Sequence, residues 1–331
     1  MDWAELDSAP GPPNWSDWWN WRAPGSASRP YRSRSRSRSL IGSGTGAGGG
    51  GGGGGGRERN GGGGREGDQE WTREGGGGTG VLVLLVVTSP ADLAAREAVR
   101  RTWGNESAVP GLSVLRLFLL GLHPQFGAEL QPVLREEDEL HQDLLQQDFL
   151  DTYNNLTLKT LMGLEWVSRF CPNASYVMKA DHDVFLNLEF LWRLLRPVRT
   201  DFLTGYVYRH TGPLRNRAYK WFVPREVYPN DTYPPYPYGG GPAYVLSADL
   251  ALRVFAVAQL LPVINMEDVF VGICLHALGV GITDPPPGAF NMYRLDYDKC
   301  RFSRLVMVHH YWPQDLLQVW PHFRNKSIRC P

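Results

Sequence analysis

Val81-Leu82-Val83-Leu84-Leu85-Val86-Val87 is a continuous apolar run rich in β-branched residues. A run of this length without polar alternation is typical of a central strand that is buried on both faces of a sheet. Thr88-Ser89-Pro90 ends the run, and Ala91 to Arg101 is rich in Ala, Arg and Glu, which predicts a helix that begins near Pro90 or Asp92. We therefore expect the folded part of the chain to begin at Val81.

The pattern of a strand followed by a helix continues along the chain. Val114–Leu120 predicts a second strand that ends at Gly121, and Tyr176–Met178 begins a third. Glu136 to Phe170 is polar and periodic, which predicts one or two helices between them. Strands that alternate with helices indicate an α/β fold with a mostly parallel sheet. In such sheets ligands bind beyond the carboxyl ends of the strands, so the functional residues are expected there.

The first quarter of the chain differs in composition from the rest. Of the 38 glycines in the 331 residues, 24 precede Val81, and an Arg-Ser repeat runs from Arg32 to Ser39. Residues 1–80 are therefore predicted to be a disordered, low-complexity Gly/Arg/Ser-rich tail, because they hold too little apolar surface to offset the chain entropy. No run of apolar residues approaches the ~18–20 that a membrane-spanning helix needs.

Arginine-rich segments like those in the tail resemble parts of RNA-binding proteins, and RNA binding through the tail is one hypothesis. Lys+Arg and Asp+Glu number 34 each, so the chain lacks the basic footprint of a nucleic-acid-binding protein. Nothing after the tail is typical of an RNA-binding domain, and we expect no nucleic-acid partner.

Two carboxylates follow the third strand, in Lys179-Ala180-Asp181-His182-Asp183-Val184-Phe185. Acids one residue apart after a buried strand can share a divalent cation with a diphosphate. The alternative is an ordinary turn capped by Asp side chains, but the position after a strand favours a metal site. The similar triplet Asp296-Tyr297-Asp298 follows no apolar strand, and we interpret it as solvated surface.

Two further constellations carry possible chemistry. Glu267-Asp268 stands at the start of a predicted helix, where acids often only complement the helix dipole, although one that faced a metal site could act as a general base. Leu305–Val308 predicts a strand that ends in His309-His310. A histidine after a strand is more often structural, but imidazole is also a common ligand of Mn- or Zn-like ions.

A set of short motifs extends over nearly all of Val81–Pro331. The first is Arg96-Glu97-Ala98-Val99-Arg100-Arg101-Thr102-Trp103-Gly104, which matches R-x-x-[IV]-R-x-[ST]-W-G. The others are Phe118–Gly121, Asp148–Thr160, Lys179–Phe185, Tyr233–Tyr236, Glu267–Gly272 and Val308-His309. In these motifs and in their order, the chain resembles the β-1,3-glycosyltransferases of glycosyltransferase family 31.

The resemblance implies a GT-A fold for residues 81–331, in which a Rossmann-like half binds a UDP-sugar and the other half binds the acceptor. It also implies inverting, Mn²⁺-dependent transfer of galactose or N-acetylglucosamine to a sugar 3-hydroxyl. By position in the motifs, Asp183 would be the main metal ligand, His309 a further ligand, and Asp181 would contact the ribose or the metal shell. Asp268 would be the catalytic base, with Glu267 as the second candidate. The resemblance assigns UDP binding to Arg96, Arg100 and Trp103.

The function expected is therefore transfer of a hexose, foremost galactose, to acceptor glycans of glycoproteins or glycolipids. The alternatives are an N-acetylglucosaminyltransferase and an inactive glycan-binding relative, and the latter would be expected to have lost Asp183 or Asp268. Lys220-Trp221-Phe222-Val223-Pro224 resembles the family's acceptor-side loop, where the aromatic pair could be core or could stack on a sugar ring.

The chain departs from the family at Gly239-Gly240-Gly241-Pro242-Ala243, where many galactosyltransferases have Cys-Ser-Gly-Thr-Gly. Glycines suit a backbone that approaches a ligand closely, but Pro242 removes one N–H. The four cysteines, Cys171, Cys274, Cys300 and Cys330, allow three pairings. Cys274 lies in a predicted helix, where it could be a buried thiol.

Glycosylation motifs favour a secretory compartment. The folded part holds five Asn-x-Ser/Thr candidates, at Asn105, Asn155, Asn173, Asn230 and Asn325. Asn155 lies in a helix-like segment and has a purely structural alternative. The resemblance implies a Golgi enzyme with a membrane anchor, so we expect the Golgi lumen or membrane, although no anchor is visible in this sequence.

Overall fold

The computed structural model describes residues 80–233 and 238–330, except the side chain of Tyr238. The predicted tail lies outside these residues apart from Gly80, and so do the last three residues of the Tyr233–Tyr236 motif. A six-stranded sheet in the order β3-β2-β1-β4-β7-β6 forms the centre of the fold. Its strands are β1 (Gly80–Val87), β2 (Leu112–Leu122), β3 (Leu144–Leu150), β4 (Tyr176–Asp181), β6 (Leu203–Tyr208) and β7 (Tyr238–Ser247).

Four of these strands, β3, β2, β1 and β4, pair in parallel, whereas β7 runs antiparallel to β4 and β6. A small second sheet has the order β5-β9-β8, built from β5 (Val184–Leu186), β9 (Met307–His309) and β8 (Phe290–Asn291). The predicted α/β fold with a mostly parallel central sheet is confirmed.

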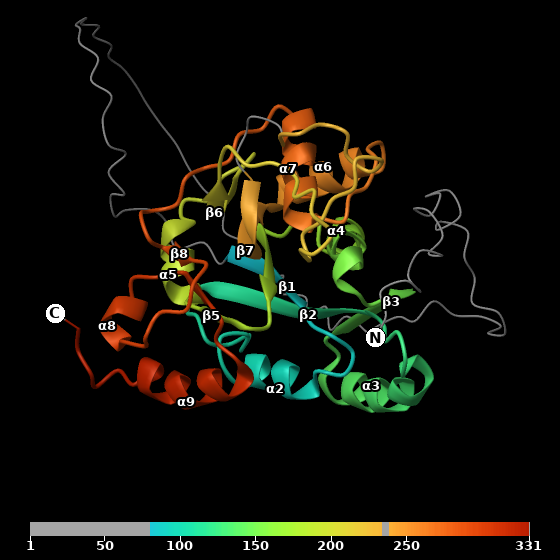
Figure 1. Cartoon of the computed structure of the whole chain (residues 1–331). Coiled ribbons are helices and arrows are strands. Elements are labelled where there is room, and N and C mark those ends of the chain that lie inside the picture. Colours follow the sequence, from blue (N-terminus) through green and yellow to red (C-terminus); the bar gives the residue numbers. More distant parts are fainter. Residues whose placement is uncertain (1–79, 234–237, 331) are drawn as a thin grey trace, which may run out of the picture.

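Helices cover both faces of the central sheet. They are α2 (Leu93–Arg101), α3 (Gly127–His141), the 3₁₀ turn η2 (Tyr153–Asn155), α4 (Leu156–Phe170), α5 (Leu188–Leu194), α6 (Ala248–Ala258), α7 (Glu267–Ala277), α8 (Lys299–Phe302) and α9 (Pro313–Arg324). Figure 1 shows α2, α3 and α9 along one side and α4, α6 and α7 on the other. No helix within residues 80–233 and 238–330 is long and apolar enough to span a bilayer.

β1 is buried on both faces, as its sequence predicts. Leu82, Leu84 and Val86 pack with Val99 and Trp103 on the α2 side. The alternate residues Val83, Leu85 and Val87 pack with side chains of α4, α6 and α7 on the other side. Because successive side chains of a strand point to opposite faces, one apolar run supplies the centre of both hydrophobic layers. This strand therefore fixes the three-layer arrangement.

The prediction of one or two helices over Glu136 to Phe170 is wrong in the middle of that range. Leu144–Leu150 forms β3, an edge strand, between the end of α3 and the turn that precedes α4. Only Phe149 of this strand is buried. An edge strand has one open side, so Gln146-Gln147-Asp148 remain partly or fully solvated and the apolar pattern that marks a strand is weak.

Pro242 lies inside β7, where a missing N–H would normally disturb the pairing of strands. The register between β6 and β7 shifts between Gly205 and Val207, which is a bulge opposite this part of β7. Proline is tolerated in sheets at such irregular positions. The departure from the family pattern at Gly239–Ala243 is therefore compatible with an intact sheet.

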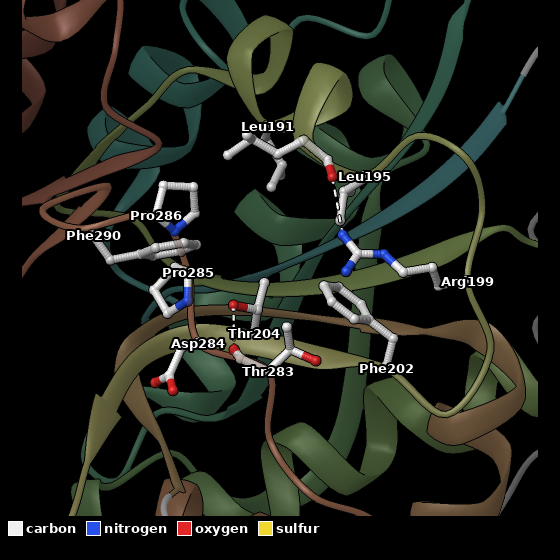
Figure 2. A pocket seen from close by; sticks show the side chains of 11 residues that line it. Leu191, Leu195, Arg199, Phe202, Thr204, Thr283, Asp284, Pro285, Pro286 and Phe290 are labelled. Carbon is white, nitrogen blue, oxygen red and sulfur yellow. Dashed lines mark hydrogen bonds between the residues drawn. The ribbon is translucent and has the colours of Figure 1, made fainter. Parts of the chain in front are cut away.

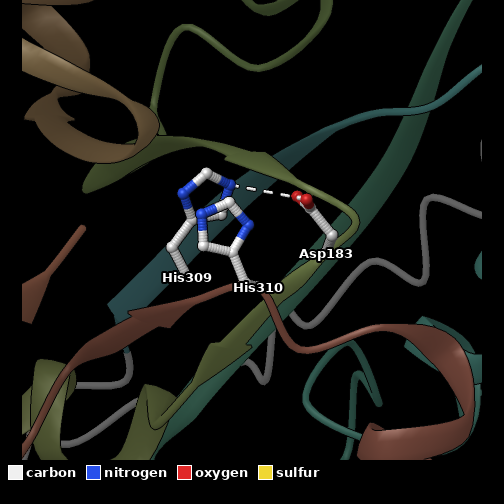
Figure 3. Close-up of side chains that lie close together, drawn as sticks. All are labelled: Asp183, His309 and His310. Atoms are coloured by element: carbon white, nitrogen blue, oxygen red, sulfur yellow. Dashed lines mark ion pairs between the residues drawn. The ribbon is translucent and has the colours of Figure 1, made fainter. Parts of the chain in front are cut away.

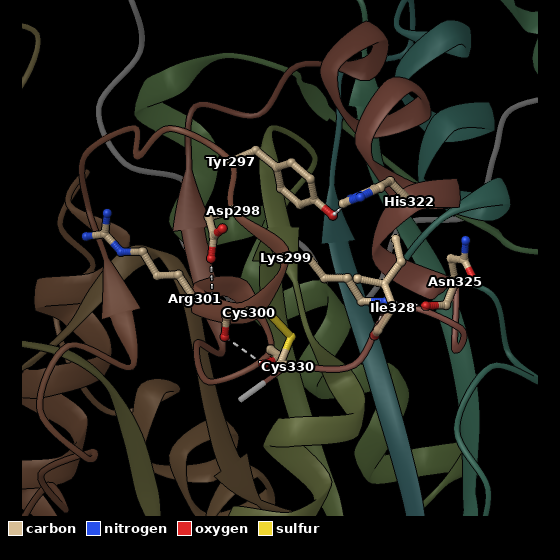
Figure 4. Close-up of a disulfide and its surroundings, with 10 residues drawn as sticks. Tyr297, Asp298, Lys299, Cys300, Arg301, His322, Asn325, Ile328 and Cys330 are labelled. Carbon is tan, nitrogen blue, oxygen red and sulfur yellow. Dashed lines mark hydrogen bonds between the residues drawn. A yellow bond between two sulfur atoms is a disulfide. The ribbon is translucent and has the colours of Figure 1, made fainter.

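Two of the four cysteines form a disulfide near the carboxyl terminus, so none of the three complete pairings that four cysteines allow is formed. A disulfide joins Cys300 of α8 to Cys330 (Figure 4). Cys171 and Cys274 are free thiols. Cys274 is buried in α7, in agreement with its interpretation as a buried thiol. Lys299 reinforces the link, because its ammonium donates to the backbone carbonyls of Asn325 and Ile328. The segment after α9 is thereby attached to α8.

Candidate active site

The predicted metal ligands and the two candidates for the base gather where β1 and β4 end and β7 begins. Val87, the last residue of β1, pairs in register with Asp181, the last residue of β4. Ala180 pairs with Ala243 of the antiparallel neighbour β7, which brings Gly241 to the same edge. This is the carboxyl edge of the parallel strands, where the α/β rule places ligands.

Asp183 and His309 come together although 126 positions separate them in the chain. In the small sheet Val184 pairs with His309, so the residue before β5 lies beside the end of β9. The Nε2 atom of His309 is 3.4 Å from Oδ2 of Asp183 (Figure 3). Burial acts to raise the pKa of Asp183, but the hydrogen bond and charge of His309 outweigh it and hold that pKa below its usual value. Asp183 is therefore available as a carboxylate.

His310 joins this pair as a third potential ligand. Its ring stacks on that of His309 with 3.8 Å between centroids, and its backbone adopts a left-handed φ of 63°. Ligand atoms of Asp183, His309 and His310 all lie within 4.8 Å of one another. Carboxylate oxygen with imidazole nitrogen is a donor set that suits Mn- and Zn-like ions, so these residues fit a divalent cation. The sequence motifs assign no separate role to His310, and its position next to His309 is the signal that could have identified it.

Asp181 is oriented differently from Asp183. Its Oδ1 atom accepts from the ammonium of Lys179 at 2.7 Å, and the group formed by Asp183 and the two histidines does not include it. Lys179 is buried, donates to the carbonyl of Gly241, and lies 3.6 Å from Oε2 of Glu267. Burial alone would lower the pKa of Lys179, but the surrounding carboxylates raise it, so the ammonium stays charged. Sequence reasoning did not single out this lysine.

Asp268 lies in the first turn of α7 and is partly exposed at the same edge. Its carboxylate accepts from two backbone N–H groups, those of Gly241 at 3.1 Å and Val269 at 2.9 Å. Burial, followed by the neighbouring charge of Glu267, raises the pKa of Asp268 to about 7. A carboxylate with such a pKa is suited to accept a proton near neutral pH.

Glu267 faces the interior instead. It is buried and accepts a hydrogen bond from the hydroxyl of Tyr244 at 2.5 Å. Burial raises the pKa of Glu267, although Lys179 and the Tyr244 hydrogen bond oppose the rise. Of the two adjacent acids, the geometry favours Asp268 as the group that can meet a substrate.

Arg96, Arg100 and Trp103, which the resemblance assigned to UDP binding, are not brought to this edge with free side chains. Arg96 and Arg100 both pair with Glu137, at 2.6 and 2.7 Å, and Arg100 also pairs with Asp143 at 2.7 Å. Arg96 and Trp103 are almost completely buried. The carboxylates of Glu137 in α3 and of Asp143, two residues after the end of that helix, neutralise these guanidinium groups, so the geometry favours a structural role for them over direct contact with a nucleotide.

The predicted acceptor-side loop is partly at the surface. Trp221 is 43% exposed, and Val223 is buried. The ammonium of Lys220 lies 4.9 Å from the ring centre of Trp221 and 5.3 Å from that of Tyr153. The charge of Asp268 contributes, after burial, to raising the pKa of Tyr153 to about 12, which places Tyr153 near the candidate base. Of the two alternatives for Trp221, the exposed position favours ring stacking over a core role.

Four of the five glycosylation candidates are exposed: Asn105, Asn173, Asn230 and Asn325. Asn155 differs, because its amide donates to the carbonyl of Leu150 at 2.8 Å and the hydroxyl of Thr157 donates to that of Ile264 at 2.7 Å. Both polar groups of that motif are thus engaged, in agreement with the structural alternative. Glycosylation of the other four stays a prediction.

Two further features lie outside the site. Asp296 and Asp298 are exposed, and Asp298 caps α8 by accepting from the N–H of Arg301 at 2.7 Å, so this second pair is surface as predicted. A small hollow between α5, β6 and the segment before β8 is lined mostly by apolar side chains such as Leu191, Phe202 and Phe290 (Figure 2). It contains none of the predicted site residues.

The fold and the residues at its carboxyl edge define an α/β protein with a carboxylate–histidine cluster beside a carboxylate whose pKa is about 7. The chain belongs to the galactosyltransferase family, whose sequence profile matches residues 94–286. It is 43% identical over 255 residues to human "Beta-1,3-galactosyltransferase 2", a match that covers 75% of this chain and 60% of that protein.

Two further relatives match over more of their own length. Mouse "Beta-1,3-galactosyltransferase 5" is 44% identical over 254 residues, which is 76% of this chain and 81% of that protein. Mouse "Beta-1,3-galactosyltransferase 1" is 38% identical over 254 residues, which is 75% of this chain and 76% of that protein. These matches confirm the family predicted from the sequence motifs.

Proposed function

We propose that the chain transfers galactose from a UDP-sugar to a 3-hydroxyl of an acceptor glycan and forms a β-1,3 linkage with inversion. The family match and the names of the relatives support the transferred sugar and the linkage. The observation that carries the proposal is the presence of Asp268, with a pKa of about 7, at the same edge as the Asp183–His309–His310 cluster.

Asp183, His309 and His310 are the residues that would hold a Mn²⁺ ion, and Asp181 would contact the ribose or the shell around the metal. A divalent cation at this place would neutralise the negative charge that accumulates on the departing UDP. Lys179 keeps Asp181 paired and connects it to the backbone of Gly241. The Asp183–His309–His310 cluster would thus serve the departing UDP, and the separate carboxylate of Asp268 would serve the acceptor.

Asp268 is the base in this proposal. It takes the proton from the acceptor 3-hydroxyl as that oxygen attacks the anomeric carbon of the donor sugar. The N–H groups of Gly241 and Val269 orient the carboxylate, and Asp268 stays partly exposed. General-base catalysis of this kind contributes about 10²–10⁴-fold. A single displacement places base and leaving group on opposite faces of the sugar, which inverts the anomeric centre.

The acceptors are proposed to be glycans of glycoproteins or glycolipids in the Golgi, at the membrane or in the lumen. The Cys300–Cys330 disulfide and the four exposed glycosylation motifs support an oxidising secretory compartment. Trp221, which is exposed and contacts the same Lys220 ammonium as Tyr153, is proposed to stack on an acceptor ring.

The experiment incubates the purified full chain with UDP-galactose or UDP-N-acetylglucosamine over a panel of sugar acceptors, with Mn²⁺ or with a chelator. Asp183→Ala and Asp268→Asn run beside the unchanged protein, and Asp296→Ala serves as the control from the exposed second pair. We expect metal-dependent galactose transfer that both site variants abolish and the control retains. The linkage and the anomeric configuration of the product are then read by NMR.

Other outcomes would assign other functions. Transfer from UDP-N-acetylglucosamine alone would make the chain an N-acetylglucosaminyltransferase. Folded protein that binds glycans without transfer or UDP release would be an inactive relative. Activity that survives Asp268→Asn would contradict the assignment of the base.

A further inference from the structure

The loop that follows β1 is held from inside the protein by two buried cations. Three successive backbone carbonyls accept hydrogen bonds from them. The ammonium of Lys159 donates to Thr88 at 2.7 Å. The guanidinium of Arg96 donates to Ser89 at 2.7 Å and to Pro90 at 3.1 Å. The direction of each peptide group in residues 88–90 is thereby set by a charge in the interior.

Both cations are costly to bury, and each is paired with a carboxylate. Lys159 pairs with Asp151 at 2.6 Å, and burial lowers its pKa. Arg96 pairs with Glu137 through its Nε atom at 2.8 Å and one terminal nitrogen at 2.6 Å. Buried ion pairs gain little net stability over apolar packing, whereas charge-assisted hydrogen bonds are strong and directional. Apolar packing in place of these two ion pairs could stabilise the fold, but it could not supply the directional hydrogen bonds to the loop.

The loop stands beside the candidate active site. Val87, directly before it, pairs in register with Asp181, and Nδ1 of His182 lies 3.2 Å from the carbonyl oxygen of Val87. A nucleotide whose diphosphate reached Asp183 would extend along this edge. Within this loop Thr88 and Pro90 are buried and Ser89 is partly exposed, so Ser89 is the residue of the first strand–helix connection that the nucleoside would meet.

We propose that Lys159 and Arg96 are positioning residues for the donor nucleotide, which act through the carbonyls of residues 88–90 and not by touching the nucleotide. The proposal rests on the proposed function, because it takes a UDP-sugar as the ligand. A loop that is ordered before binding spares the ligand the entropy of ordering it, and so raises affinity. This role is compatible with the burial of Arg96, which has no exposed surface with which to touch a ligand directly.

The decisive variant is Arg96→Lys in the full chain. A lysine can keep an ion pair with Glu137, but a single ammonium cannot also bridge both carbonyls as the planar guanidinium does. We expect the dissociation constant for UDP, titrated in the presence of Mn²⁺, to rise about tenfold. The reason is that the variant loses about one pair of the hydrogen bonds that order the loop before UDP binds. The kcat at saturating donor and the KM for the acceptor are expected to change little.

Arg116→Lys is the matched control. Arg116 belongs to the same network, pairing with Asp143 and donating to the carbonyl of Gly104, but it has no bond to residues 88–90. A purely structural role predicts the same loss of thermal stability and the same UDP affinity in both lysine variants. The positioning role predicts weaker UDP binding in Arg96→Lys alone.

Ala91→Gly tests the loop without touching a buried charge, so that the proposal can be tested even if Arg96→Lys fails to fold. Ala91 is exposed at the end of the loop, and glycine there adds backbone freedom. We expect UDP to bind about 2–5-fold more weakly, with faster amide exchange in residues 89–92. Unchanged UDP affinity in this variant and in Arg96→Lys would overturn the positioning role while leaving the transferase intact. Failure of the unchanged protein to bind UDP would overturn the proposed function and this inference together.

Discussion

The carboxylate of Asp268 accepts a hydrogen bond from the backbone N–H of Gly241, with 3.1 Å between Oδ2 and the nitrogen. This bond joins the first turn of α7 to the beginning of β7. The carbonyl of the same glycine accepts from Lys179, which pairs with Asp181. One residue of the glycine-rich segment thus connects the candidate base to an acid at the end of β4. The position of the base depends on backbone geometry, which only the folded sheet supplies.

Asp268→Asn is expected to reduce kcat by about 10²–10⁴-fold, because an amide cannot take the acceptor proton. The backbone N–H of Gly241 can still bond to the amide oxygen, so the fold should be retained. Titration with UDP should give a dissociation constant within about twofold of the original, since the base does not contact the nucleotide in our proposal. A large loss of UDP binding would show that Asp268 has another role.

Transfer should depend on pH through Asp268. Only the carboxylate form can act as base, and burial followed by the charge of Glu267 raises its pKa to about 7. The rate should therefore fall as the pH drops through about 7 and level off above it. The measurement is kcat/KM for the acceptor from pH 5 to 9 at constant ionic strength.

Glu267→Gln tests the cause of that pH dependence. It removes the neighbouring negative charge while it keeps an acceptor for the hydroxyl of Tyr244. The pKa of Asp268 should fall, and the acid limb of the pH profile should move to lower pH. An unchanged or higher midpoint would indicate that another group controls the limb.

Loss of the disulfide should destabilise the protein without removing a site residue. The bridge between Cys300 and Cys330 spans 30 positions, for which the chain-entropy account predicts about 3–4 kcal/mol. Cys330→Ser should lower the thermal midpoint, and reductant should lower the midpoint of the unchanged protein but not of this variant. Cys171→Ser, which removes a free thiol, should leave the effect of reductant in place.

Asp143, in the ion-pair network that packs beside α2, is predicted to have a structural role. Asp143 is buried and pairs with Arg100 at 2.7 Å and with Arg116 at 2.5 Å. Asp143→Ala would leave buried guanidinium charge uncompensated and should lower the free energy of unfolding by about 3–5 kcal/mol. The exposed pair of Arg225 with Asp231 is the comparison, and Asp231→Ala should cost under about 1 kcal/mol in the same urea titration.

Part of the fold could be read directly from the sequence. Val81–Val87 is apolar at every position because β1 carries helices on both faces, so its central place was predictable. β3 was not, because an edge strand leaves Gln146 and its neighbours partly solvated and lacks that pattern. A local sequence pattern predicts a strand when burial requires apolar residues in it. The pattern is absent when much of the strand is exposed to solvent.

The site divides in the same way. The sequence by itself determined which residue types follow each strand, and the family motifs selected Asp183, His309 and Asp268 from them. Only the tertiary structure separated Asp268 from the adjacent Glu267 and turned Arg96 away from the surface. It also added Lys179 and His310 to the site. Side-chain direction, burial and charge pairing depend on elements far apart in the chain, and those meet only when the sheet and its helices assemble.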